Sequence, residues 1–233
     1  MVTAEVVPFV EQSSGVTGTP QVPQQRGERL LDIAVRYAAE RHWDVLPGAW
    51  LEDDGATTYC SCGARDCRTP GAHPLATDWT TAATGSASVI HTLWTEHPRA
   101  SILLPTGRTF DALDVPETAG CLALARLERR GLPLGPVIRT PDRRMLFLVL
   151  PGAATKVPDL VRKLGWSSPA GIGLRLHGEG TYLPAPPTRT GRYAPVQWAV
   201  PPTPANRWLP DTEDLLSPLA YACGREAAML RMS

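Results

Sequence analysis

The segment from Tyr59 to Pro74 constrains this chain more than any other, because it gathers three cysteines and one histidine. Thiolate and imidazole are the ligands that Zn²⁺ prefers, and four of them complete a tetrahedral structural site. The spacing C-x-C-x4-C-x5-H fits one compact knuckle, and intervening glycines let the backbone turn around an ion. The sequence therefore predicts structural zinc with no open catalytic position, the alternative being reduced cysteines in an irregular loop. The predicted ligands are Cys60, Cys62, Cys67 and His73.

Composition favours a globular protein of the cytoplasm. Of the 233 residues, 43% are hydrophobic and 20% are charged, which is ordinary for a globular protein. We find neither an apolar run long enough to span a membrane nor a secretion signal. In the cytoplasm clustered cysteines are metal ligands rather than disulfides, and Cys121 and Cys223, with their apolar neighbours, are expected to be buried thiols. Scarce lysine beside abundant Arg, Ala and Pro is typical of a GC-rich bacterium.

The net charge is zero, but positive side chains are in excess between residues 121 and 192. A basic segment of this kind permits contact with phosphates. Arginines scattered over a solvated surface would give the same excess, so charge alone leaves both interpretations open.

The chain divides into three predicted parts. Residues 1–26 have the composition of a disordered lead-in, 27–200 form the domain with its knuckle at 59–74, and 201–233 hold a proline-rich linker and a C-terminal helix. Helix and strand patterns mix along the domain, which predicts an α/β or α+β fold. Apolar periodicity predicts helices at 27–42, 86–97, 117–130, 157–164 and 211–230, and strands at 43–47, 101–105, 110–115, 137–139, 145–150, 172–176, 181–185 and 193–200.

Four segments, in order, carry a resemblance to a known family. They are the opening helix and strand at 34–47, the cysteine loop ending in PGAHP at 70–74, the run from IHTLW through PTG to LDV at 90–115, and GEGTY leading into APPT at 178–188. Together they resemble the N-terminal domain of bacterial and plasmid primase-polymerases (prim-pol) of the archaeo-eukaryotic primase superfamily. The resemblance implies a small α/β module beside a mixed sheet like that of RNA-recognition motifs (RRM-like), with a zinc knuckle.

The resemblance also implies a chemistry. In active members the sheet carries a D-x-D or D-x-E pair, a third acid, and a histidine that contacts nucleotide phosphate. The acids hold two Mg²⁺ or Mn²⁺ ions, which activate a 3′-hydroxyl and neutralise the leaving pyrophosphate. Residues i and i+2 of a strand share one face, so the pair addresses the same ions. The implied partners are single-stranded or primed DNA and nucleotides.

The acids of this chain depart from that pattern. Asp114 matches the first acid, but Pro116 stands where the second belongs. Asp111, three residues before Asp114, faces the opposite way on a continuous strand. Glu117 reaches the site only if the strand ends or bulges at Pro116. The catalytic candidates are therefore Asp114 with Asp111 or Glu117, and Glu179 is a further neighbouring acid.

The remaining positions depart as well. Met145 stands where the family histidine would be, and Gly173 or Arg175, depending on the alignment, occupies the slot of the third acid. A single Asp supplies too little charge for two Mg²⁺ ions. We therefore expect a catalytically degenerate domain that binds nucleic acid or nucleotides. The alternatives are an active template-dependent primase/polymerase and a regulatory module that binds a protein partner. The expected phosphate-contacting residues are Arg139, Arg143, Arg144, Arg175 and His177.

Overall fold

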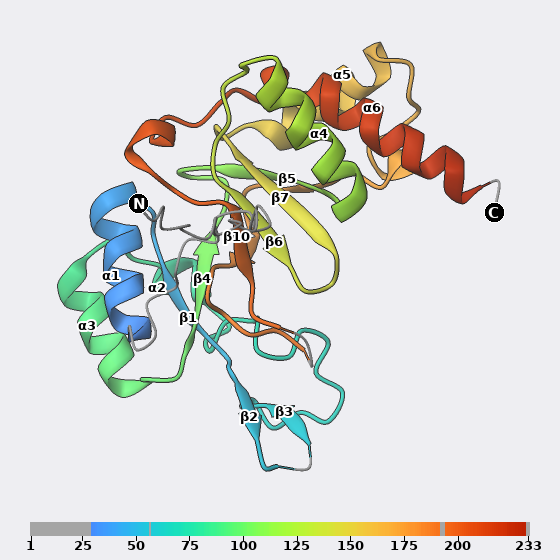
Figure 1. Cartoon of the computed structure of the whole chain (residues 1–233). Coiled ribbons are helices and arrows are strands. Elements are labelled where there is room, and N and C mark those ends of the chain that lie inside the picture. The colour runs from blue at the N-terminus through green and yellow to red at the C-terminus, as the bar shows by residue number, and fades with distance from the viewer. Residues whose placement is uncertain (1–28, 56, 192–193, 232–233) are drawn as a thin grey trace, which may run out of the picture.

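The structure, a computed structural model, describes residues 29–55, 57–191 and 194–231. Helices and antiparallel sheets mix along the chain, which confirms the predicted α/β (α+β) class (Figure 1). The predicted lead-in at 1–26 lies outside the described residues. Within the described part, no helix has both the length and the apolar character that crossing a membrane requires.

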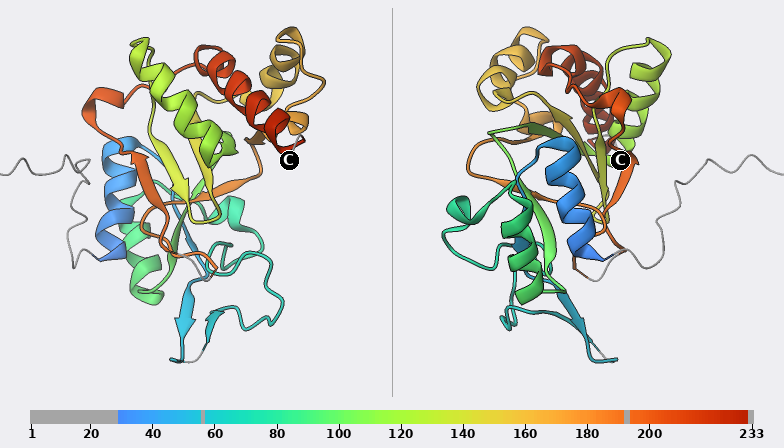
Figure 2. Two further views of the ribbon diagram at one scale, coloured as in Figure 1. Left: turned by 45° about the vertical axis from the view of Figure 1, so that its right-hand side comes forward. Right: turned by 90° about the vertical axis from the view of Figure 1, so that its left-hand side faces the viewer.

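A small three-stranded sheet with two helices forms the first unit. Its strand order is β1 (Leu46–Gly48), β4 (Ser101–Pro105) and β9 (Tyr182–Pro184), with antiparallel pairing throughout. Helices α1 (Leu30–Arg41) and α3 (Ala87–Glu96) pack on one another beside this sheet (Figure 2). Their apolar faces are buried, as the helical spacing predicts.

A five-stranded antiparallel sheet forms the second unit. From edge to edge its order is β10, β6, β7, β5 and β8. Helices α4, α5 and α6 pack against one of its faces (Figure 1). The bounds are β5 Asp111–Pro116, β6 Val137–Thr140, β7 Arg144–Val149, β8 Arg175–His177, β10 Gln197–Val200, α4 Glu117–Arg129, α5 Ala153–Lys163 and α6 Thr212–Leu230.

The alternation of side chains along the central strands separates two hydrophobic cores. On β5, Leu113 and Val115 pack with the three helices, whereas Ala112 packs with the first unit. On β7, Phe147 belongs to the helical side and Leu146 to the other. Helix α6 contributes buried residues to the helical core, so part of the segment beyond residue 200 packs on the sheet; the boundary at 200 itself stays a prediction.

Several elements differ from the predicted ones. The hairpin of β2 (Leu51–Asp53) and β3 (Thr58–Cys60) and the short helix α2 (Trp79–Ala82) were not predicted, since they are short and partly polar. The strand predicted at 172–176 starts at Arg175, because Ala170–Ile172 forms a 3-10 turn that ends at Gly173 with a φ of 72°. A second 3-10 turn spans Pro204–Asn206.

The two isolated cysteines behave differently. Cys223 is buried as predicted, but the prediction for Cys121 is wrong, because it is exposed. Local sequence did not show which face of α4 meets the sheet. The buried positions of that helix are Ala119, Gly120, Ala123 and Leu127.

Candidate functional site

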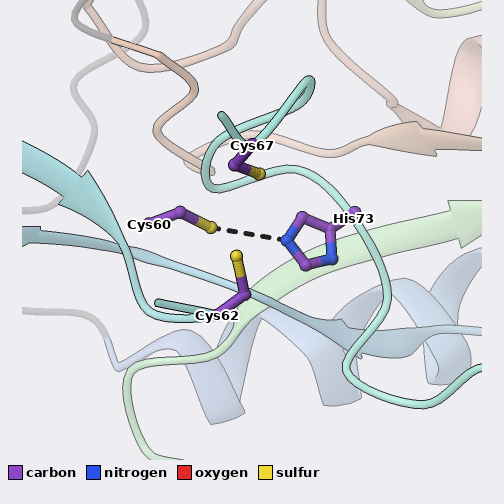
Figure 3. Close-up of side chains that lie close together, drawn as sticks. All are labelled: Cys60, Cys62, Cys67 and His73. Atoms are coloured by element: carbon purple, nitrogen blue, oxygen red, sulfur yellow. Dashed lines mark hydrogen bonds between the residues drawn. The ribbon is translucent and has the colours of Figure 1, made fainter. Parts of the chain in front are cut away.

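The knuckle brings its four predicted ligands together. The ligand atoms of Cys60, Cys62, Cys67 and His73 all lie within 4.8 Å of one another (Figure 3). The Cys60 Sγ lies 3.4 Å from the His73 Nε2. Zn–S and Zn–N bond lengths in a tetrahedral site place a sulfur and a nitrogen ligand about 3.6 Å apart. The cluster could therefore hold a metal ion.

Backbone contacts orient the first and last ligands. His73 Nδ1 donates to the carbonyl oxygen of Pro74 at 3.0 Å, which leaves the Nε2 lone pair directed at the thiols. The Gly71 N–H donates to the Cys60 Sγ at 3.4 Å. Strand β3 ends at Cys60, and the Ala49 N–H donates to the His73 carbonyl at 2.7 Å. The β2–β3 hairpin and the segment after β1 thus fix both ends of the knuckle.

The thiols differ in acidity. The Ala64 N–H lowers the pKa of Cys62 to about 7, whereas burial raises the pKa of Cys67 to about 11. A metal binds the thiolate form, so binding at Cys67 displaces a proton. Three thiols and one imidazole with a fixed tautomer can hold a metal ion and leave it no open position, which suits a structural role.

Asp114 lies on β5 at the centre of the second site, and both oxygens of its carboxylate have partners. Arg144 Nε donates to Oδ1 at 2.7 Å, and His177 Nε2 lies 3.1 Å from Oδ2. The side chain of Asp114 is only 7% exposed and that of Arg144 13%. Arg144 also donates to the carbonyl oxygens of Asp114 and Gly173, at 3.0 and 2.9 Å. The arginine is therefore fixed across the acid.

The other candidate acids lie elsewhere. Asp111 is buried, and its Oδ2 accepts the N–H groups of Gly152 and Ala153, at 2.9 and 2.8 Å, at the start of α5. Glu117 begins α4 and forms ion pairs with Arg139 and Arg143. Glu179 follows Gly178, and its backbone packs against Gly107. The contacts of these three acids are therefore with groups other than Asp114.

A cavity of about 430 Å³ opens over Asp114. Strands β5 to β8 supply one side of the cavity. Asp114 lies directly opposite Leu146 on β7 and Arg175 on β8, and residues paired in this way share one face of the sheet. Strand β9 supplies another side, and the knuckle a third. The charged lining residues are Arg68, Asp114, Asp142, Arg144, Arg175 and His177.

The five predicted phosphate-contacting residues separate into two groups. Arg144, Arg175 and His177 line the cavity, whereas Arg139 and Arg143 pair with Glu117. Sequence reasoning missed Arg68, which follows a metal ligand directly and has no local signal of its own. It also missed Arg144 as the partner of Asp114, because their contact depends on strand register.

Comparisons with known proteins gave one match. The family described as bifunctional DNA primase/polymerase, N-terminal, matches residues 34–208, which include the knuckle and the whole five-stranded sheet. Neither the curated proteins nor the solved structures gave a match.

Proposed function

The chain belongs to the family of bifunctional DNA primase/polymerase N-terminal domains, and we propose that it is a catalytically degenerate member. On this proposal it binds nucleic acid or nucleotides in the cavity over Asp114. The observation that carries the proposal is the engagement of both Asp114 carboxylate oxygens by Arg144 and His177. Each oxygen keeps a second lone pair, so the obstacle to a catalytic metal ion is the positive charge of Arg144 beside the acid.

Electrostatics favours this interpretation. A metal ion bound to Asp114 would lie beside the Arg144 guanidinium. Two like unit charges about 4 Å apart repel by about 4 kcal/mol at an effective dielectric constant of about 20, and a divalent ion doubles this energy. Arg144 donates hydrogen bonds to three protein acceptors, namely Asp114 Oδ1 and the carbonyl oxygens of Asp114 and Gly173. These bonds oppose displacement of the arginine by a metal ion.

Among the described residues, Asp114 belongs to no group of three or more acids, histidines or cysteines that could hold a metal ion. Asp111 caps α5, and Glu117 forms ion pairs with two arginines. Two-metal phosphoryl transfer needs several carboxylates on the same pair of ions. This arrangement supports binding without catalysis.

The cavity lining suits a ligand that carries phosphate. Arg175 occupies the slot of the family's third acid in one of the two alignments, and it lines the cavity as an exposed residue. Its guanidinium is a group that binds phosphate through paired N–H donors. Leu146, Tyr182 and Leu183 offer apolar surface for a base or a sugar. A volume of about 430 Å³ falls within the range of about 300–1,000 Å³ that is usual for small-molecule sites.

For the knuckle we propose Zn²⁺ as the bound ion. Three thiolates and one imidazole match the preference of zinc better than that of Mg²⁺ or Ca²⁺, which take oxygen ligands. The ion would supply folding free energy and a fixed geometry rather than a reactive position.

Two measurements on the purified protein test the proposed function. Fluorescence anisotropy with a labelled single-stranded oligonucleotide should show binding that weakens with salt, and a primed template with all four deoxynucleotides and Mg²⁺ or Mn²⁺ should show no extension. Arg175→Ala should weaken binding about tenfold, since a charge-assisted hydrogen bond contributes about 1.5–3 kcal/mol. It should also reduce the slope of log affinity against log salt by about 0.7.

Arg130→Ala is the matched control, because this exposed arginine is the C-cap of α4 and is not among the cavity-lining residues. Its affinity should stay within about twofold of wild type. Primer extension that disappears in Asp114→Ala would instead establish an active polymerase. Absence of any binding to oligonucleotide or nucleotide would refute the binding role and leave the protein-interaction alternative.

A further inference from the structure

The knuckle forms one side of the cavity over Asp114. Arg68, Thr69, Pro70 and Ala72 line the cavity, and all of them lie between the ligands Cys67 and His73. This short piece of chain, residues 68–72, is called the knuckle wall below. A metal ion would hold it at both ends, because each end is attached to a ligand.

Few other contacts hold the knuckle wall in place. The Gly191 N–H donates to the Pro70 carbonyl at 2.9 Å. A Cβ atom on Gly71 would lie 2.4 Å from the Arg189 carbonyl oxygen, so the wall approaches that loop closely. Apart from Gly71 its residues are exposed or half-buried, and they supply little apolar burial. The hydrogen bond from the Ala49 N–H holds the His73 end without metal, so the end that a metal ion would chiefly constrain is Cys67, next to Arg68.

The knuckle wall carries a charge into the cavity. Arg68 follows Cys67 directly, and Arg68 and Arg175 both line the cavity. Within the described part of the chain, neither arginine has a hydrogen-bond or ion-pair partner, in contrast to Arg144. Two acids line the same cavity, Asp114 on β5 and Asp142 in the β6–β7 turn. Two arginines from separate elements repel one another unless an anion lies between them.

We propose that Arg68 is a phosphate-binding residue of the cavity and that the metal ion of the knuckle controls ligand binding by positioning it. With metal bound, residues 68–72 close one side of the cavity and hold Arg68 opposite the sheet. Without metal the Cys67 end of that side loses its anchor, and the cavity loses one of its cations. The inference rests on the proposed binding function, and it adds a residue and a form of regulation to that site.

The test compares two arginines of the same knuckle. Arg68→Ala should weaken binding of the labelled single strand about tenfold and reduce the salt slope by about 0.7. Arg65→Ala is the matched control, because Arg65 is exposed in the same knuckle but does not line the cavity. Its affinity should stay within about twofold of wild type. Equal affinities of the two variants would overturn the proposal.

Metal removal tests the regulatory part. A chelator, with zinc release measured colorimetrically, should lower the affinity of wild type to about the level of Arg68→Ala. The same treatment should change the affinity of Arg68→Ala by less than about twofold, because its arginine is already absent. Equal losses in both proteins would show that the metal does not act through Arg68. Circular dichroism of both chelated samples shows whether metal removal unfolds the protein. If it does, the comparison of Arg65→Ala with Arg68→Ala still tests the role of Arg68, because it needs no metal removal.

The outcomes separate this inference from the proposed function. If wild type binds and Arg175→Ala weakens binding while Arg68→Ala does not, the cavity binds its ligand and the role of Arg68 is refuted. If wild type binds neither oligonucleotide nor nucleotide, the proposed function fails and this inference fails with it.

Discussion

At the residue scale, the sequence predicts best where the chemistry is local. The four metal ligands lie in one short segment, so their spacing alone indicated the cluster that the structure brings together. The engagement of Asp114 could not be predicted in this way. Arg144 reaches the acid across paired strands, and His177 reaches it from a third strand. Such contacts depend on register, which no local pattern specifies.

Asp111 illustrates the same limit and gives a prediction. Alternation along β5 predicted that it faces away from Asp114, but not that it caps α5 through Gly152 and Ala153. Asp111→Ala should lower the free energy of unfolding by about 2–4 kcal/mol, because it removes a helix cap and leaves buried N–H groups unpaired. Urea denaturation measures the change. Asp142→Ala, at an exposed turn, should cost less than about 0.5 kcal/mol. A stable Asp111→Ala variant would contradict the capping role.

At the element scale, the bounds of the long periodic segments were predicted within a few residues. The short elements, and those whose ends depend on residues distant in sequence, were not predicted. Strand β4 has the predicted bounds, because it is an apolar run between clear turn signals. Helix α5 starts at Ala153 rather than at 157, because its first turn depends on a carboxylate from β5 that lies distant in sequence. The β2–β3 hairpin has three-residue strands and too little apolar pattern to detect.

The packing of α6 gives a prediction at this scale. A Cβ atom on Gly224 would lie 2.2 Å from the indole ring of Trp166. Alanine is favoured over glycine within a helix by about 1 kcal/mol, but overpacking costs about 1–3 kcal/mol and a rigid ring cannot yield easily. We expect Gly224→Ala to lower the free energy of unfolding by about 1–2 kcal/mol and to shift tryptophan fluorescence.

A double-mutant cycle provides the control. In a Trp166→Leu background, which removes the ring, Gly224→Ala should be neutral or slightly stabilising. The same destabilisation in both backgrounds would show that Trp166 does not restrict this position.

At the scale of the whole molecule, the mixed class followed from the order of elements, whereas the sheet order and the position of the cavity did not. The five-stranded sheet separates two cores, and its central strands contribute side chains to both. Neither core can lose its packing without disturbing strands that the other core needs. Cooperative unfolding is the expected consequence.

Two adjacent residues of β7 test this cooperativity. Phe147 faces the helical core and Leu148 the other core, and both are fully buried. Phe147→Ala should lower the free energy of unfolding by about 3–5 kcal/mol and Leu148→Ala by about 2–5 kcal/mol. Each variant should shift one transition, coincident by circular dichroism and tryptophan fluorescence. Two separate transitions, each moved by one of the variants, would show that the cores unfold independently.

The arginine fixed across Asp114 has a consequence for the conditions under which the cavity would be occupied. In a polymerase site the positive charge comes from bound divalent ions, so the fraction of active sites depends on the concentration of those ions in solution. Here the positive charge beside the acid is a guanidinium of the chain itself. If the cavity binds phosphate, its occupancy would follow the abundance of the ligand and would be insensitive to magnesium starvation.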